Sequence, residues 1–495
     1  MSRRRPAVLA ALAATALALA GAPSPAPAAA PVLPACALGS GTAADTTTLR
    51  REVDAQVRAY VRRESPGPAN SRAYAAGLAA YLYGFPTVQL HATVLNYPRN
   101  QIVGIGQLAD PSTVQVVAPN HDTLYSVSQV DLSYGPLLLE TPPTAGRYAV
   151  VQLLDAFTNA FAYVGDGAAG ASGERAAIVP PGWTGTLPAG VRLIRAPTRT
   201  LWLLGRTLSR GAADQATAKA LLGRYSLTPL PDAVAGTRRN ALVLDAFPQN
   251  LKRVIAPKGI AFFDQLGADL AKDPAPARDA CALRTFAAAG VDAGRTPSTQ
   301  LTGARRRAVD AAATDGARLL SRIVRQRLAA GRRAGHGWTA FPKNIARFGA
   351  DYATRALVAT VGLGANTAEK AIYPSTTTDD RGRGLDGRHT YVVRFKPGQS
   401  PPVRAFWSLT LYDARILLYA NPLQRYALGD RSPGLKRDPD GGLTIRVSHA
   451  TPPAAQRSNW LPAPSGPFSL YLRLYEPEPR AASGAWVPPA VRRMR

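Results

Sequence analysis

The sequence predicts an α+β protein, mainly β, in which a helical middle region joins two antiparallel β-sandwich modules. Short apolar or alternating segments, separated by Gly and Pro turns, occupy residues 113–208 and again the last third of the chain. Strands that follow one another without regular helices between them are typical of antiparallel sandwiches rather than doubly wound sheets. Residues 215–348 are instead rich in Ala, Arg and Leu at helical spacing, which predicts the helical region.

Residues 1–30 have the pattern of a secretory signal peptide. Three arginines, residues 3–5, precede an apolar run over residues 7–22, and small residues at 28–30 offer cleavage sites. The run is short for a membrane span, and Pro-rich sequence follows it, which favours cleavage over anchoring. We therefore expect cleavage near residue 30 and a secreted or cell-envelope protein with no transmembrane segment. General and twin-arginine export both stay open.

Residues 31–70 predict a Pro/Ala-rich spacer and a first helix. Apolar side chains of this helix share one face, namely Leu49, Val53, Val57, Tyr60 and Val61. A second helix is expected over residues 71–83, because Gly84 and Pro86 follow and both residue types end helices.

Strands are expected next. "RYAVVQLLDAF" (147–157) is mostly apolar on both alternating sides, which indicates a strand covered on both faces. "GVRLIRAPT" (190–198) and "TLWLLGRTL" (200–208) have a similar pattern. Turn-like "PPGWTG" (180–185) separates them from the earlier strand.

The clearest helix of the middle region lies within residues 304–338. Arginines surround its apolar stripe, which predicts an amphipathic helix packed on the domain with a solvated basic face. A membrane-lying or polymer-binding helix is the alternative. The stripe comprises Val309, Ala312, Leu319, Leu320, Ile323, Val324 and Leu328.

The last third predicts strands at "TYVVRF", "VRAFWSLTLYD", "ILLYA", "LTIRVSH" and "FSLYLRLYEP". In the last of these, four apolar residues from Phe468 to Leu474 alternate with Ser469, Tyr471, Arg473 and Tyr475. One face therefore belongs to the core, and the other carries aromatic and cationic tips. The expected division is a signal peptide (1–30), a spacer with the first helix (31–70), an N-terminal module (71–215), a helical connecting region (216–348) and a C-terminal β module (349–495).

The chain is strongly basic. Its formal charge of +27 becomes +24 without the three signal-peptide arginines. For an exported protein this favours anionic envelope polymers or lipid headgroups over nucleic acid as partners, although a general Arg/Ala-rich residue usage explains it equally well. Only Cys36 and Cys281 remain after cleavage, and an oxidising compartment would let them form a disulfide.

Long segments of the sequence resemble a known pair of modules. "YLYGFPTVQLHATVLNYPRN", "APNHDTLYSVSQVDL", "RYAVVQLLDAFTNAFAYVGDGAAG" and "PPGWTG" resemble domain of unknown function 1254. "GLDGRHTYVVRF", "PPVRAFWSLTLYD", "NPLQRYALGD", "DGGLTIRVSH" and "NWLPAPSGPFSLYLRLYEP" resemble its usual companion, domain of unknown function 1214. The resemblance covers about residues 74–480. It implies an exported protein with jelly-roll-like β-sandwich modules and a capacity for homo-oligomers, and it implies no established reaction.

The family's Pro-Asn-x-Asp-Thr-x-Tyr pattern falls on residues 119–125. His121 occupies its variable position, so this histidine is a poor candidate for a common catalytic base. Metal-binding, nucleotide-binding and serine-nucleophile motifs are absent from the sequence, and we expect neither a metal nor a cofactor.

Carboxylates, aromatic rings and arginines are the remaining candidates for chemistry. Asp122 and Asp155 are the expected catalytic pair, since two carboxyls about 5 to 9 Å apart hydrolyse glycosidic bonds. Tyrosine and tryptophan offer platforms for sugar rings, and arginine grips carboxylate or phosphate groups. The candidate substrate-binding residues are Asn120, Tyr125, Arg147, Tyr148, Arg206, Trp407, Trp460 and Arg473.

Each candidate also has a plain structural explanation. Asn120 and Asp122 suit turns that brace the start of a strand, and Trp407 and Trp460 suit burial. Asp155 ends an apolar strand, where it either pairs with an arginine or has a perturbed pKa. We expect a hydrolase acting on a glycan or another envelope polymer. The alternative is a non-catalytic envelope protein that recognises anionic polymer through a basic, aromatic-lined surface.

Overall fold

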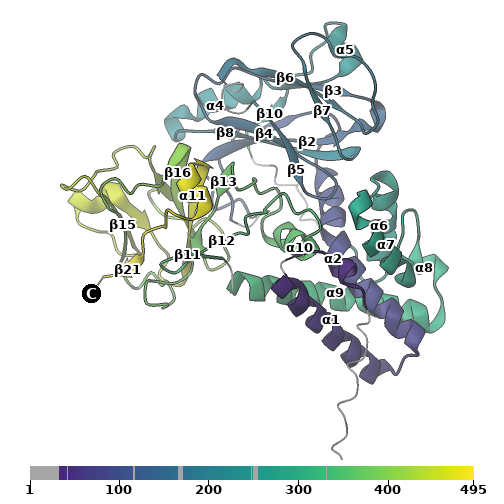
Figure 1. Ribbon diagram of the computed structural model, residues 1–495. Helices are drawn as coiled ribbons and strands as arrows, with labels where there is room; N and C mark the ends of the chain where they lie inside the picture. Colours follow the sequence, from purple (N-terminus) through teal and green to yellow (C-terminus); the bar gives the residue numbers. More distant parts are fainter. Residues whose placement is uncertain are drawn as a thin grey trace, which may run out of the picture.

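The computed structural model describes residues 33–494 except residues 42, 115–117, 166–170, 247, 249–254, 330 and 331. The expected signal peptide lies outside the described residues. Figure 1 shows three parts, an N-terminal β-sandwich at the top, a C-terminal β-sandwich at the left and a helical bundle at the lower right. The predicted α+β class with two sandwich-like β modules is therefore confirmed.

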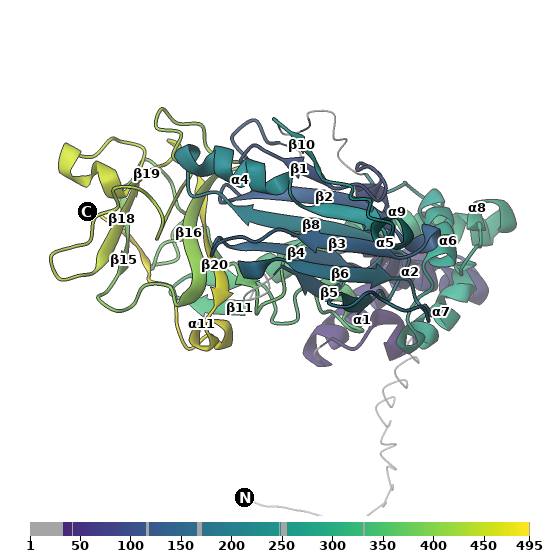
Figure 2. The ribbon, with the colours of Figure 1, turned by 90° about the horizontal axis from the view of Figure 1, so that it is seen from above.

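The N-terminal sandwich consists of two sheets whose facing sides form one apolar core. Val151 and Leu153 of the larger sheet share this core with Leu139 and Ile178 of the smaller one. Most strand pairs are antiparallel, while β1–β10 and β6–β7 are parallel. The larger sheet, seen from above in Figure 2, has the order β10 (Leu242–Leu244), β1 (Val103–Ile105), β2 (Thr123–Asp131), β8 (Thr200–Leu208), β4 (Ala149–Leu154), β5 (Ala160–Val164). The smaller has the order β7 (Arg192–Arg195), β6 (Glu174–Val179), β3 (Leu137–Thr141), β9 (Ser226–Pro229).

Two of these strands come from the expected helical connecting region. β9 pairs with β3, and β10 pairs with β1, so residues 226–229 and 242–244 belong to the N-terminal sandwich. Strands of three or four residues are too short to show a period against the helical pattern around them. Two helices pack near them, α4 (Gln215–Leu222) and α5 (Leu230–Val234).

The C-terminal sandwich also closes around one apolar core. Leu470, Leu472 and Leu474 face residues such as Val393 and Ile445 of the second sheet, as the alternation of the sequence predicts. One sheet has the order β11 (Arg332–Gly335), β12 (Trp338–Ala340), β14 (Ser375–Thr376), β20 (Phe468–Pro477), β16 (Val403–Asp413), β17 (Ala427–Gly429), with β13 (Ala371–Ile372) also paired to β20. The other has the order β19 (Trp460–Pro462), β18 (Leu443–Ser448), β15 (Tyr391–Phe395), β21 (Val491–Arg493). A short helix, α11 (Pro479–Ser483), follows β20.

One predicted strand is absent from this module. "ILLYA" (416–420) forms only an isolated bridge between Leu418 and Tyr412. Ile416 has a φ of 61°, a left-handed conformation that interrupts an extended strand. The apolar composition of this segment predicted burial correctly, since Leu417 and Leu418 are buried.

The helical bundle surrounds α2, which is buried along most of its length. α1 and α9 lie along it, and α9 contributes the predicted stripe from Val309 to Val324 to the core. The helices are α1 (Ala43–Glu64), α2 (Pro68–Val94), α6 (Ala261–Lys272), α7 (Ala280–Phe286), α8 (Pro297–Gln300), α9 (Gly303–Ala329) and α10 (Tyr352–Val361).

The second helix is longer than the sequence predicts, because α2 continues through Gly84 and Pro86 to Val94. A side chain at Gly84 would lie 2.3 Å from Leu266, so glycine is required there for the contact with α6. Pro86 lacks the N–H that would bond the Leu82 carbonyl. Arg355 donates to the neighbouring Tyr83 carbonyl at 3.0 Å and so holds this turn of the helix. Tertiary packing thus overrides the two helix-ending signals.

A buried ion pair fastens α2 to α6 and to the N-terminal sandwich. His91 Nε2 lies 2.9 Å from Asp273 Oδ2, and its Nδ1 lies 3.0 Å from the Thr87 carbonyl. The second oxygen of Asp273 accepts from the backbone N–H of Thr200, at the start of β8. Burial alone lowers the pKa of His91, but the hydrogen bond to Asp273 and the charge of Asp269 outweigh it, so the pKa is raised.

This geometry predicts a stability that falls in mildly alkaline solution. The folded-state pKa of His91 lies above its ordinary value of 6.5. Its stabilising effect is therefore complete below about pH 6.5 and is lost as the pH rises through the folded pKa. Urea unfolding of the wild type should show this loss as the pH rises above about 6.5, and His91→Gln should show a flatter profile. Parallel pH profiles for the two proteins would contradict the assignment.

Candidate functional site

The Asn120–Thr123 segment lies at the contact between the two sandwiches. Locally, Asn120 Oδ1 accepts from the Asp122 N–H at 2.7 Å, and Asn120 Nδ2 donates to Thr123 Oγ1. This is the turn that braces the start of β2. The same Nδ2 also donates to Tyr475 Oη of β20 at 2.9 Å, so the brace reaches into the other module.

Asp122 is buried at this contact by partners from the C-terminal module. Ser408 Oγ of β16 donates to its Oδ2 at 2.6 Å, and Arg431 pairs with its Oδ1 at 3.1 Å. The guanidinium of Arg431 also lies 4.0 Å from the centre of the Phe406 ring. Both carboxylate oxygens are therefore occupied by the protein's own side chains.

Backbone carbonyls of the same segment complete the contact. Tyr412 Oη donates to the Pro119 carbonyl at 2.7 Å, and Arg473 donates to the Ala118 carbonyl at 3.0 Å. His121 packs edge-on against Tyr426, with ring centres 4.8 Å apart. We call this set of contacts the module joint. It consists of Ala118, Pro119, Asn120, His121 and Asp122 with Phe406, Ser408, Tyr412, Tyr426, Arg431, Arg473 and Tyr475.

The second face of β20 is thus covered by the N-terminal module. Arg473 and Tyr475 are buried there, and Tyr148 of the N-terminal sandwich packs against Tyr475 with ring centres 5.4 Å apart. The expected display of aromatic and cationic tips on this face is wrong for these residues, because they line an internal contact.

Asp155 lies away from the module joint. Its Oδ1 accepts from the backbone N–H groups of Phe157 and Asn159 at 2.9 and 2.8 Å, which makes it a turn brace at the end of β4. Burial raises its pKa, against the hydrogen bonds from Asn159 and Phe157 and the charge of Arg355. The perturbed pKa that the sequence suggested is present, with burial as its cause.

The sheet register separates the two expected catalytic carboxylates. The Ser209 N–H at the end of β8 donates to the Asp122 carbonyl, whereas Leu154, just before Asp155, lies opposite Trp202 of the same strand. The stretch of β8 between Ser209 and Trp202 spans about 20 Å at 3.3 Å per residue. Asp122 and Asp155 therefore cannot act as a pair on one glycosidic bond, which corrects the paired-carboxylate hypothesis.

The remaining candidate binding residues lie apart from one another and already contact other residues of the protein. Arg147 pairs with Asp214, its Nη2 lying 2.7 Å from Oδ1. Trp407 is buried in the C-terminal core, and Trp460 is buried with its Nε1 donating to the Ser448 carbonyl. These tryptophans are not surface platforms.

Arg206 ties the N-terminal sandwich to the loop after α10. It is buried and donates to Gln152 Oε1 at 2.8 Å, to Asn366 Oδ1 at 3.1 Å and to the Gly364 carbonyl at 2.6 Å. Tyr125 lies beside it, with the guanidinium 5.8 Å from the ring centre. Its polar partners are neutral protein groups, so it holds a loop in place rather than a ligand.

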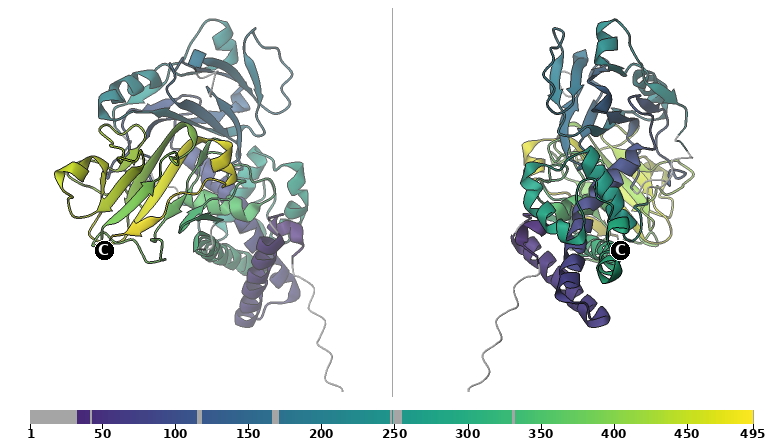
Figure 3. Two further views of the ribbon diagram at one scale, coloured as in Figure 1. Left: turned by 60° about the vertical axis from the view of Figure 1, so that its left-hand side comes forward. Right: turned by 90° about the vertical axis from the view of Figure 1, so that its right-hand side faces the viewer.

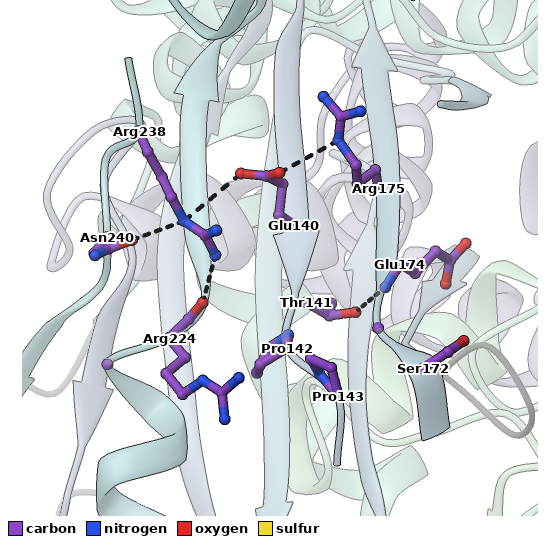
Figure 4. Close-up of a pocket in the computed structure, with 12 residues that line it drawn as sticks. Glu140, Thr141, Pro142, Pro143, Ser172, Glu174, Arg175, Arg224, Arg238 and Asn240 are labelled. Carbon is purple, nitrogen blue, oxygen red and sulfur yellow. Dashed lines mark hydrogen bonds and ion pairs between the residues drawn. The ribbon is translucent and has the colours of Figure 1, made fainter. Parts of the chain in front are cut away.

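A cavity of about 500 Å³ lies at the outer sheet of the N-terminal sandwich (Figure 4). Glu140 is bound by its neighbours there, with Arg175 at 3.3 Å and Arg238 at 3.7 Å. Glu174 is opposite Thr141 in the register, while Glu140 is opposite Arg175, so the two glutamates start on opposite faces of the sheet. Glu174 is engaged as well, by Arg192 at 2.9 Å and by the Gly165 N–H at 2.7 Å, so both carboxylates of this cavity already have partners within the protein.

The long helix α9 of the helical bundle carries an excess of positive charge. α9 carries seven arginines and two aspartates, a net charge of +5 (7 − 2). Both aspartates accept hydrogen bonds within the protein. Asp310 accepts from the Ile260 N–H, and Asp315 accepts from Tyr74 and Arg318. α1 lies beside α9, with Arg63 of α1 at 3.8 Å from Asp315. Figures 1 and 3 show both helices at the end of the molecule away from the N-terminal sandwich.

The side chains of six exposed arginines on these two helices have no hydrogen bond or ion pair within the part of the chain that the structure describes. On α1 they recur at intervals of seven and four residues, which places them on one helical face. Their stripe on α9 extends over about 28 Å at 1.5 Å per residue. We call them the arginine face, and they are Arg51, Arg58, Arg62, Arg306, Arg307 and Arg325.

The sequence showed the basic side of α9 but not the stripe on α1. The seven-residue spacing from Arg51 to Arg58 on α1 can be read from the sequence, whereas the packing of α1 beside α9 cannot. Within the described residues, no helix is long and apolar enough to cross a membrane, and no cluster of three or more metal-binding side chains is present.

Comparisons with known proteins confirm the two-module resemblance. Residues 99–229 match the family model described as protein of unknown function (DUF1254), and residues 370–479 match that of DUF1214. No curated protein matches the chain.

Among solved structures, the chain is similar to the VPA0106 protein from Vibrio parahaemolyticus, with 22% identity and a TM-score of 0.64 over 86% of this chain and 100% of that one. A likeness at this identity shows a shared fold. An uncharacterized protein from Burkholderia cenocepacia matches at 15% identity and a TM-score of 0.39, covering 91% of this chain and 98% of that chain.

Proposed function

We propose that this chain, with its DUF1254 and DUF1214 modules, is an exported, non-catalytic protein of the cell envelope that binds an anionic polymer through the arginine face. The observation that carries the proposal is the arginine face itself. Its six guanidinium groups are exposed, and no carboxylate of the protein pairs with them within the described residues. Guanidinium forks match carboxylate and phosphate groups along such a polymer.

Export supports an envelope polymer as the partner. The N-terminal sequence has the pattern of a signal peptide, and Cys36 and Cys281 form a disulfide. Disulfides persist in oxidising compartments outside the cytosol. The aromatic part of the expected binding surface has no support, because Trp407, Trp460 and Tyr475 are buried.

The hydrolase hypothesis has less support than binding. It required Asp122 and Asp155 to converge, and they lie at opposite ends of β8 with their oxygens engaged by the protein. A hydrolase would need a different catalytic pair, and the cavity with Glu140 and Glu174 does not provide one.

Binding to a polyanion should depend on both the arginine face and salt. The mature protein should be retained on polygalacturonate beads and not on neutral dextran beads. Each arginine near an anionic surface contributes about 1 kcal/mol. Changing Arg306, Arg307 and Arg325 together to Gln should therefore weaken binding about 100-fold. At 1 M salt the screening length is only about 3 Å, so the wild type should elute.

The control variant makes the same change in charge on the C-terminal module. Arg381, Lys396 and Arg437 are exposed there, and changing all three to Gln should leave retention nearly unchanged if the arginine face is the site. An equal loss in both triple variants would show that net charge alone drives retention, and the proposal would then be wrong. Product release from polysaccharides and wall fragments, followed by mass spectrometry, would instead support an enzyme.

A further inference from the structure

We propose that a cavity beside the Cys36–Cys281 disulfide binds a carboxylate carried on an apolar molecule. This cavity has a volume of about 640 Å³, within the range of about 300 to 1,000 Å³ for small-molecule sites. It is separate from the arginine face, and the inference does not depend on the polymer-binding proposal. The residues around it are Ala35, Cys36, Gly39, Ser40, Gly41, Thr46, Thr47, Arg50, Arg278, Ala350 and Tyr352.

Two arginines supply the only charges among these lining residues. The Nε atom of Arg50 is buried and has no hydrogen-bond partner within the described residues. Arg278 lies 3.9 Å from Asp279, but that carboxylate is already occupied by the hydroxyls of Tyr83 and Tyr352 at 2.9 and 2.7 Å. The side chain of Arg50 lines the cavity and has no ion pair within the described residues, so its terminal guanidinium nitrogens are the donors that a ligand carboxylate would engage.

The other walls match the apolar part of such a ligand. Ala35, Ala350 and the ring of Tyr352 line the cavity together with the disulfide of Cys36. Hydroxyl groups of Ser40 and Thr46 are also present, and Thr46 Oγ1 already donates to the Gly41 carbonyl. An anion with an apolar body fits this combination better than inorganic phosphate, which would leave the apolar walls uncovered.

Covalent and backbone links hold the cavity in shape. The disulfide joins the 3₁₀ helix Ala35–Leu38 to α7, and the Ser40 N–H donates to the Ala350 carbonyl at 3.0 Å. Gly39 has a φ of 86°, and a Cβ there would lie 2.2 Å from that carbonyl, so only glycine fits. Three segments far apart in the chain, residues 35–50, the region of Arg278 and residues 350–352, therefore meet in a fixed arrangement, which lowers the entropic cost of binding.

Isothermal titration calorimetry of the mature, oxidised protein with decanoate tests the site. We expect decanoate to bind, decanol to bind at least tenfold more weakly, and inorganic phosphate to give no signal in the same concentration range. Arg50→Gln and Arg278→Gln should each weaken decanoate binding about tenfold, since each removes a charge-assisted hydrogen bond.

Exposed arginines outside the cavity and outside the arginine face provide matched controls. Arg72 lies on α2, and Arg284 lies on the same helix as Cys281; both are exposed and neither lines the cavity. Arg72→Gln and Arg284→Gln should bind decanoate like the wild type. Circular dichroism at 222 nm checks that all four variants fold. Absence of decanoate binding, equal binding of decanol, or undiminished binding by Arg50→Gln and Arg278→Gln would each overturn the inference.

Discussion

Asp122→Ala should destabilise the protein by about 3 to 5 kcal/mol. The substitution breaks a buried ion pair, leaves the Ser408 hydroxyl without its acceptor and leaves Arg431 with only the longer contact to Asp430 at 3.4 Å. Losses of this size follow from breaking such a pair. In the wild type, Asp122 accepts from Ser408 and pairs with Arg431, both from the C-terminal module. The free energy of unfolding of the mature protein, measured in urea by circular dichroism, should show the loss.

The partner variants separate this role from a catalytic one. Arg431→Met should cost more than Asp122→Ala, because it leaves the deeply buried Asp122 carboxylate without its ion-pair partner. Asp122→Ala instead leaves Arg431, which is about 20% exposed and still lies 3.4 Å from Asp430. The double variant should be more stable than the sum of the two single losses predicts, since no stranded charge remains. Asp245→Ala, which removes an exposed pair with Lys219, should leave the unfolding midpoint nearly unchanged. If Asp122→Ala unfolds like the wild type, the module joint does not hold the sandwiches together.

The module joint shows what the sequence could and could not predict. The alternation from Phe468 to Tyr475 correctly predicted β20 and its core face, because every second residue of a strand points to the same side. Alternation does not say what covers the other face. Arg473 and Tyr475 therefore resembled ligand-binding groups, although the N-terminal module covers them.

Asp122 was open to two interpretations for a related reason. Asn, Asp and Thr at the start of a strand predict a turn, and the turn is present. Its partners Ser408 and Arg431 lie about 290 and 310 residues further along the chain. No local pattern specifies such a contact, so the sequence showed a polar cluster and left its purpose open. The paired-carboxylate hypothesis failed on the same point, since only the sheet register sets the distance between Asp122 and Asp155.

Loss of the disulfide should be the other large effect. Cys36 and Cys281 are 245 residues apart in the chain, with Cα atoms 6.0 Å apart. In the chain-entropy model, closing a loop of this length in the unfolded state stabilises the folded state by about 5 kcal/mol, the upper end of the observed range. Changing both cysteines to Ser should therefore lower the free energy of unfolding by several kcal/mol, as measured in urea.

Reduction provides the matched control, because it breaks the bond without a substitution. Dithiothreitol should lower the urea midpoint of the wild type toward that of the double-serine variant and leave the variant itself unchanged. Equal midpoints for oxidised and reduced wild type would mean that the bond contributes nothing.

The disulfide would also link stability to the export proposed above. Leu33, Ala37 and Leu38 are buried in the bundle core next to Cys36, so an intact bond keeps this N-terminal segment and the cavity wall in place. Protein made without the signal peptide would stay in a reducing compartment and lack this constraint. We therefore expect thiol titration to find no free thiol in the exported protein and two in the retained form. The retained form should unfold at a lower urea concentration than the exported form.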